Sequence, residues 1–156
     1  MIVTIFEADT LIGSAEIFAL DPPMGVAMAK FRPAPAYDVE RHANVVDGDY
    51  VADRGDILRI ELPGGIRLRS QAISIQDWPA LGEFELHILG ILEPDFDELF
   101  KDHPDYRAYY DLDLSDEQRA EKQRVLTAHR RRRLLKEWSI LGVLVASIAG
   151  SIILFA

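Results

Sequence analysis

Residues 138–156 restrict the architecture more than any other part of the sequence. The stretch reads WSILGVLVASIAGSIILFA and holds no Asp, Glu, Lys or Arg. As an α-helix its 19 residues would span about 28 Å, close to the roughly 30 Å hydrocarbon core of a bilayer. Its ten Leu, Ile, Val and Phe residues favour insertion by about 3 to 6 kcal/mol. We therefore predict one transmembrane helix, with membrane-anchor positions at Trp138, Ile140, Leu141, Leu144, Ile148, Ile152 and Phe155.

A basic cluster lies directly before this stretch and consists of Arg130, Arg131, Arg132, Arg133 and Lys136. Cations at a membrane surface are attracted to anionic lipids, and the positive-inside rule keeps them in the cytoplasm. We expect everything N-terminal to them to lie there as well. This topology resembles that of tail-anchored proteins, which implies an architecture and no activity. The alternatives are a buried C-terminal helix and, for the arginine run, a nuclear-localisation or nucleic-acid patch.

Small residues recur every four positions within the apolar stretch, at Gly142, Ala146 and Gly150. Small side chains on one face let another transmembrane helix approach closely. We therefore predict a helix–helix contact, either a homodimer or a contact with a larger membrane protein. Small residues are also common in transmembrane helices that make no such contact.

The charge of the chain is divided unequally between its two parts. Residues 1–128 carry 25 acidic and 12 basic side chains, whereas residues 129–156 carry five basic and one acidic. An acidic body repels phosphate backbones, so we predict no nucleic-acid partner and expect a basic protein partner instead. The sequence has no cysteine, which excludes disulfides and zinc–thiolate sites. We predict no cofactor.

Short segments of β character follow one another through residues 1–92. Apolar and β-branched residues predict strands at residues 2–6, 12–20 and 26–31, with a hairpin turn at the DPPMG of residues 21–25. The first residues therefore do not resemble a signal peptide. A polar stretch at residues 37–56 predicts a long loop with one short strand at residues 44–46.

The clearest β pattern covers residues 57–75, where ILRIEL and IRLRS flank a Pro-Gly-Gly turn. This hairpin places Glu61 opposite Arg67, a favourable cross-strand pair. The apolar phase changes after Gln71, which indicates a bulge. A further strand carries Phe84, Leu86 and Ile88. Short strands without helices between them predict a small β barrel or sandwich.

Helical signals begin after Pro94. Phe96, Leu99 and Phe100 predict a short helix that ends before His103-Pro104. Ser115 and Gln118 form a capping box, from which one long helix is expected to run toward the C-terminus. We therefore predict four segments: a β domain at 1–92, a helical and tyrosine-rich addition packed on it at 93–114, a charged juxtamembrane helix at 115–137 and a transmembrane helix at 138–156.

Two sets of polar residues are candidates for chemistry. Glu85 and His87 share the outer face of a predicted strand and are placed to act as base and acid or as metal ligands. The alternative hypothesis is that both are simply exposed polar residues of an alternating strand. The polar loop is the second set, and its side chains could bind a divalent cation or simply be solvated; they are Asp38, Glu40, His42, Asp47, Asp49, Asp53 and Asp56.

Weaker patterns occur near the end of the acidic body. Asp95 with Asp97, and Asp111 with Asp113, have the spacing of cation ligands but lack the rest of a known motif. Tyrosines at 106, 109 and 110 form either an aromatic recognition patch or part of the packing against the β domain. The sequence holds no nucleophile elbow, P-loop, dinucleotide fingerprint or zinc-protease motif. We predict no catalytic residues and no metal ligands.

The sequence thus predicts a membrane-tethered cytoplasmic binding or regulatory module with an acidic β domain. One alternative is a membrane-anchored metal-dependent hydrolase that uses the polar loop with His42 or His87. Another is a soluble oligomer whose apolar C-termini bundle together.

Overall fold

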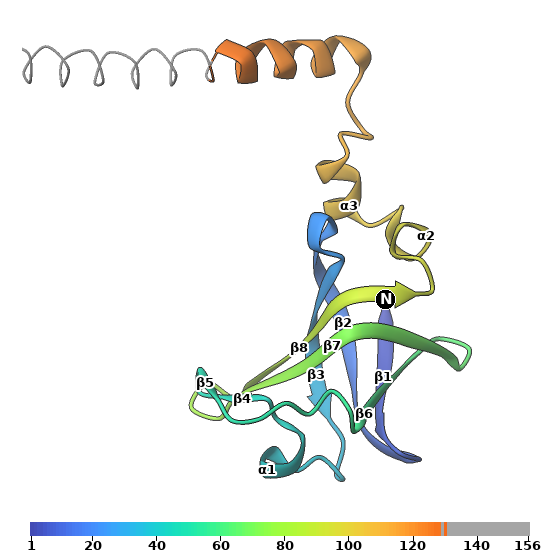
Figure 1. Ribbon diagram of the computed structural model, residues 1–156, viewed down its shortest axis with the longest axis vertical. Coiled ribbons are helices and arrows are strands. Elements are labelled where there is room, and N and C mark those ends of the chain that lie inside the picture. The colour runs from blue at the N-terminus through green and yellow to red at the C-terminus, as the bar shows by residue number, and fades with distance from the viewer. Residues whose placement is uncertain (129, 131–156) are drawn as a thin grey trace, which may run out of the picture. The chain divides into compact units, whose positions relative to one another are not determined.

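Six antiparallel strands close into a barrel in the computed structural model, which describes residues 1–128 and 130. Their order around the barrel is β7-β6-β1-β2-β3-β8, and pairing of β7 with β8 closes it (Figure 1). The β barrel that the sequence predicts as one of two β architectures is therefore confirmed. The strands are β1 (Ile2–Glu7), β2 (Thr10–Asp21), β3 (Val26–Pro33), β6 (Leu58–Leu62), β7 (Ile66–Trp78) and β8 (Glu83–Glu93).

The strands alternate in burial because side chains of successive residues point to opposite faces of a sheet. In β6, residues 58, 60 and 62 point inward and are nearly inaccessible, whereas 59 and 61 are half-buried. The inward set fills the barrel with aliphatic and aromatic side chains. The core consists of Val3, Ile5, Ile12, Ala15, Ile17, Leu20, Ala27, Ala29, Phe31, Leu58, Ile60, Leu62, Leu68, Ile73, Ile75, Leu86, Ile88, Ile91, Phe96 and Phe100.

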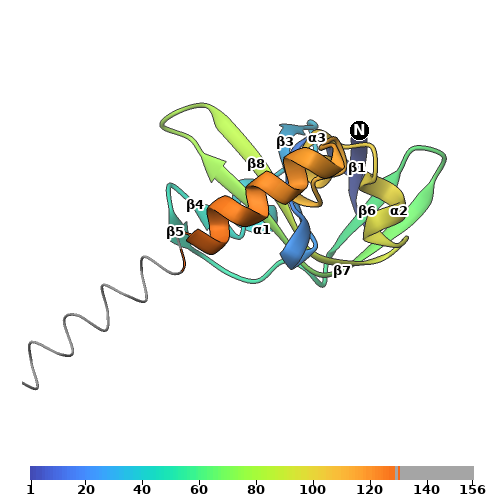
Figure 2. The ribbon, with the colours of Figure 1, turned by 90° about the horizontal axis from the view of Figure 1, so that it is seen from above.

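Both predicted hairpins are present. A short 3-10 helix η1 (Pro22–Met24) joins β2 to β3, and Gly25 ends it in the left-handed region with φ of 61°. Gly64 and Gly65, both at positive φ, form the turn between β6 and β7. Figure 2 shows the β6–β7 and β7–β8 turns on opposite sides of the barrel.

The predicted pairing of Glu61 with Arg67 holds in register only. The two residues lie opposite each other across β6 and β7. The Glu61 carboxylate, however, forms an ion pair with Arg59, two residues away on the same strand and therefore on the same face. The Arg59 guanidinium also lies 4.9 Å from the centre of the Phe6 ring.

β-bulges absorb the changes of apolar phase in the longest strands. The predicted irregularity near Gln71 lies between Arg69 and Ser70, and the extra residue is Leu92 on the partner strand β8. A second bulge lies in β2, where Ile17 pairs with Ala29 and Ala19 with Met28, so Phe18 is unpaired. A bulge turns the side chain of its extra residue and bends the strand.

The polar stretch 37–56 is more ordered than a loop. It contains a helix α1 (Val39–His42) and two short strands, β4 (Val45–Val46) and β5 (Asp49–Tyr50). Asp38 begins α1, because its Oδ1 accepts the backbone N–H groups of Glu40 at 2.9 Å and Arg41 at 3.3 Å. β4 pairs in parallel with the end of β7 and antiparallel with β5, which extends the sheet beyond the barrel.

Two helices lie at one end of the barrel (Figure 1). The first is α2 (Phe96–Phe100), which buries both of its phenylalanines as predicted. The second is α3 (Pro104–Tyr109), which begins at Pro104 with His103 as its N-cap. The backbone N–H of Leu20 donates to Asp105 Oδ2 at 2.8 Å and fixes α3 to β2.

The chain divides into two units at residues 112 and 113. In the second unit the predicted capping box is present. The Ser115 N–H donates to Gln118 Oε1 at 2.9 Å, and the Gln118 N–H donates to Ser115 Oγ at 3.3 Å. Residues 116–128 are helical.

The predicted transmembrane helix, with its anchor and small-residue positions, lies outside the described residues, as do Arg131, Arg132, Arg133 and Lys136. Of the basic cluster, Arg130 is described and is exposed. No helix within residues 1–128 is long and apolar enough to cross a membrane.

Candidate functional site

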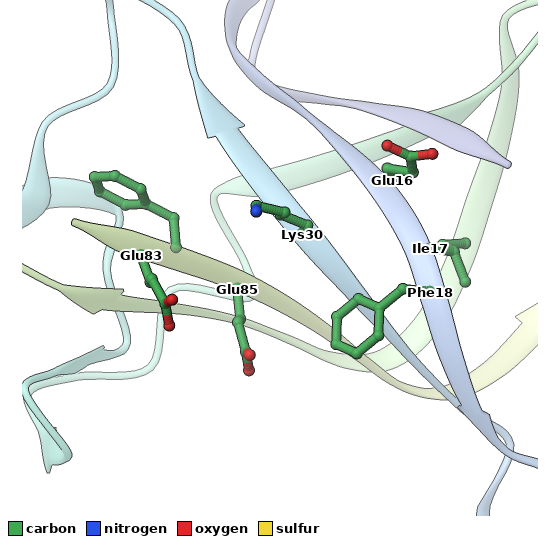
Figure 3. A pocket seen from close by; sticks show the side chains of 7 residues that line it. Glu16, Ile17, Phe18, Lys30, Glu83 and Glu85 are labelled. Carbon is green, nitrogen blue, oxygen red and sulfur yellow. The ribbon is translucent and has the colours of Figure 1, made fainter. Parts of the chain in front are cut away.

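A groove lies on the outer face of β2, β3 and β8 (Figure 3). Its volume is about 500 Å³, and it is open to solvent. It combines aromatic side chains with carboxylates and a single amine. We call it the Phe18 groove, and its residues are Glu16, Ile17, Phe18, Lys30, Glu83, Phe84 and Glu85.

Phe18 lies in the groove on the outer face of β2, and it is the extra residue of the β2 bulge. Ile17 before it and Leu20 after it both point into the core, at 5% and 8% exposure. Regular alternation cannot bury both, because they are three residues apart. The bulge resolves this conflict and leaves Phe18 outside, with 53% of its surface exposed.

Charged residues cross the groove in a single row. Glu16 of β2 lies opposite Lys30 of β3, which in turn lies opposite Glu85 of β8. Although both neighbours are acidic, Lys30 forms no ion pair with any described carboxylate; Glu16 is bound to Arg32 at 3.2 Å instead. With Glu83 included, the groove carries three negative charges and one positive charge.

The predicted pair Glu85 and His87 is brought together on the outer face of β8. Their side chains, His87 Nε2 and Glu85 Oε2, are 3.0 Å apart. The Gln76 amide N–H donates to His87 Nδ1 at 3.0 Å, so Nε2 carries the ring proton that faces Glu85. One oxygen of Glu85 is thereby occupied and the carboxylate is held in a fixed orientation at the edge of the groove.

A second polar cluster lies beneath α1, and we call it the loop network: Glu7, Tyr37, Arg41, His42 and Asp77. His42 is only 2% exposed. Its Nδ1 accepts the backbone N–H of Asp38 at 2.9 Å, which places the ring proton on Nε2, 3.1 Å from Glu7 Oε2. His42 is therefore a hydrogen-bond bridge between α1 and β1.

Arg41 completes the contact with β1. Its Nε lies 3.0 Å from Glu7 Oε1 and 2.8 Å from Oε2. Hydrogen bonds from Arg41, and secondarily from His42, lower the pKa of Glu7 to about 2. The same interaction with Glu7 raises the pKa of Arg41.

Tyr37 connects the loop network to the end of β7. Its hydroxyl donates to Asp77 Oδ2 at 3.0 Å, and Asp77 is only 4% exposed. Burial, and secondarily the hydrogen bond to Asp77, raises the pKa of Tyr37 above its usual value. The ring stacks on His42 and meets Phe31 and Phe84 edge to face.

Two acidic side chains of the polar loop have local structural roles. Asp38 caps α1, and Asp53 Oδ1 accepts the N–H of Gly55 at 2.9 Å. Asp95 caps α2 in the same way, by accepting the N–H groups of Asp97 and Glu98. Asp111 has a positive φ of 54° just after α3. Within residues 1–128, no group of three His, Asp or Glu side chains could hold a metal ion.

The three neighbouring tyrosines are divided between two environments. Tyr106 packs against the core, and its pKa is raised by burial and by a hydrogen bond to Asp97. Tyr109 and Tyr110 are 52% and 45% exposed, and their rings contact each other edge to face.

Sequence reasoning missed Phe18, Lys30 and Tyr37. The signal for Phe18 was present, since Ile17, Phe18, Ala19 and Leu20 are four consecutive apolar residues in a strand that otherwise alternates. No local sequence pattern predicts the contacts of Tyr37 with Asp77 and Phe84, because these residues are 40 or more positions away.

Comparison with known proteins gives no relative. No family model matches the chain, and neither a curated protein nor a solved structure matches it significantly.

Proposed function

We propose that the chain is a membrane-tethered cytoplasmic binding or regulatory module whose acidic barrel recognises a basic protein partner. The observation that carries the proposal is the Phe18 groove, an open surface in which an exposed aromatic side chain is surrounded by carboxylates. Aromatic side chains are enriched at protein interfaces, and clustered charges of one sign select partners of the other.

The charge of the barrel unit supports a basic partner. Residues 1–112 contain 21 acidic and nine basic side chains, a net charge of −12. Such a surface attracts cationic segments over a Debye length of about 8 Å at physiological salt and repels nucleic acid.

The tether rests on the sequence of residues 138–156. An uncharged stretch of this length preceded by five cations has the features of a membrane span with its cytoplasmic flank. Attachment to a membrane raises the effective concentration of the barrel toward partners on the same surface, which gives the anchor a function.

The membrane part is tested by fractionating cells that express the full chain. We expect it to stay with membranes after alkaline carbonate washing and to become extractable once residues 138–156 are deleted. An acceptor glycosylation site added after residue 156 should be modified, whereas one added before residue 1 should not. Recovery of the intact chain in the soluble fraction would refute the tether.

The predicted homodimer is tested separately from the tether. Changing Gly142→Leu together with Gly150→Leu blocks the close approach of two helices. We expect these changes to reduce self-association of the span in a membrane reporter assay, with Ile148→Leu as the control on a bulky position. Unchanged association would remove the homodimer and leave the tether in place.

A further inference from the structure

We propose that the Phe18 groove binds a basic segment of the partner in extended conformation, with apolar side chains alternating with arginine or lysine. This inference rests on the proposed function and assigns its recognition surface. The occupant follows from three properties of the groove: its shape, its exposed aromatic surface and its charge.

The shape of the groove comes from strands that separate. The β3–β8 ladder ends where Lys30 faces Glu85, whereas the β7–β8 ladder continues to Glu83. Among the described strands, Glu83 and Phe84 are therefore paired on the β7 side only. A segment that lies along this part of β8 is extended, because it follows the strand.

The exposed aromatic surface of the groove is the ring of Phe18. Phe18 is 53% exposed on β2, whereas Phe84 of β8 packs on the core and meets Phe31 and Tyr37 edge to face. An apolar side chain placed against Phe18 covers surface that the barrel leaves in water, and such a contact is favourable in proportion to the area covered. Aliphatic side chains of leucine size suit a groove of about 500 Å³ that several residues line.

The charge selects cations as the flanking residues. Glu16, Glu83 and Glu85 come from two of the three strands, so the carboxylates face the groove from both sides. Glu85 is held in orientation by His87, which leaves its second oxygen for an incoming cation. Lys30 lies in the middle of the row and repels an incoming cation. Removal of its charge should therefore strengthen binding.

The test is a titration of the full chain, in a mild nonionic detergent, with a short fluorescent peptide of alternating arginine and leucine. A peptide of alternating arginine and serine keeps the positive charge but lacks the apolar side chains. A peptide of alternating aspartate and leucine keeps the apolar side chains but reverses the charge. We expect the arginine–leucine peptide to bind at least about tenfold more tightly than either.

Variants locate the site. Phe18→Ala should weaken binding about tenfold, whereas Leu92→Ala should not change it. Leu92 is a matched control, because it is likewise the extra residue of a bulge and is 52% exposed. Glu83→Gln with Glu85→Gln should weaken binding about tenfold, against less than about twofold for Glu98→Gln with Asp102→Asn.

Removal of the Lys30 amine is expected to have the opposite effect on peptide affinity. Lys30→Met should tighten binding about threefold, while Lys101→Met, which makes the same change in net charge at the C-cap of α2, should have little effect. If the peptide binds and groove variants behave like their controls, the groove is the wrong surface and the acidic module remains. If the arginine–leucine peptide fails to bind at low salt, both the groove and the basic partner are refuted.

Discussion

The loop network and the Phe18 groove are both polar clusters on one barrel, but they differ in where their partners lie. Each member of the loop network is bound to another member, and two of its five residues are less than 5% exposed. In the Phe18 groove, Lys30 lies between two carboxylates and pairs with neither among the described residues. Polar groups that satisfy one another stabilise a fold, whereas groups that face solvent beside an exposed aromatic ring are available to a partner.

The largest effect should come from His42→Ala. The change removes both ring hydrogen bonds and the stacked contact with Tyr37 from a buried position. We expect the free energy of unfolding to fall by about 3 kcal/mol in denaturant titrations of the full chain. His87→Ala on the outer face should cost less than about 1 kcal/mol; equal losses would show that burial does not distinguish the two histidines.

Tyr37→Phe isolates a single hydrogen bond of the same network. The variant keeps the ring and removes the hydroxyl that donates a hydrogen bond to the buried Asp77 carboxylate. We expect a loss of about 1 to 3 kcal/mol, measured in the same way. Tyr50→Phe is the control, because Tyr50 is 70% exposed, and it should leave stability unchanged. Indistinguishable variants would contradict a structural role for the Tyr37 hydroxyl.

Glu7 makes part of the network sensitive to acid. Its pKa is lowered from 4.5 to about 2 in the folded chain, so the unfolded state takes up a proton first as pH falls. The contribution of Glu7 is therefore complete above pH 4.5 and disappears as pH falls to about 2. Thermal unfolding across this range should show a smaller acid destabilisation for Glu7→Gln than for the natural sequence. Parallel pH profiles would exclude the ion pair with Arg41 as its cause.

The smallest effect on stability is expected in the Phe18 groove. Phe18→Ala and Lys30→Met remove side chains that make few contacts within the barrel, so unfolding free energies should stay within about 0.5 kcal/mol. A loss comparable to that of Tyr37→Phe would place Phe18 among the structural residues and remove the contrast between the two clusters.

The barrel strands were predictable because each buries one face only. Leu58, Ile60 and Leu62 alternate cleanly with charged residues, and Pro63-Gly64-Gly65 admits few structures other than a turn. Closure of the barrel was not predictable in the same way. It depends on β7 and β8 pairing along most of their lengths while β8 also reaches β3, and sequence alternation does not specify which strand is a neighbour.

The two polar clusters were recovered unequally from the sequence. Glu85 and His87 were found because they are two residues apart on one strand. His42 was identified as a polar residue of the acidic loop, yet its structural partner Glu7 comes from the first strand, 35 residues earlier. Contacts at such separations depend on the tertiary fold, which local patterns do not encode.

Closure of the barrel has a further consequence for how copies of the chain meet one another. Open β-sheets expose rows of unpaired backbone groups, through which neighbouring molecules can join edge to edge and aggregate. Here β8, the last strand in the sheet order, pairs with both β3 and β7, and the other end of the order is β5, which is two residues long. Closure therefore reduces the length of backbone through which two copies could join edge to edge.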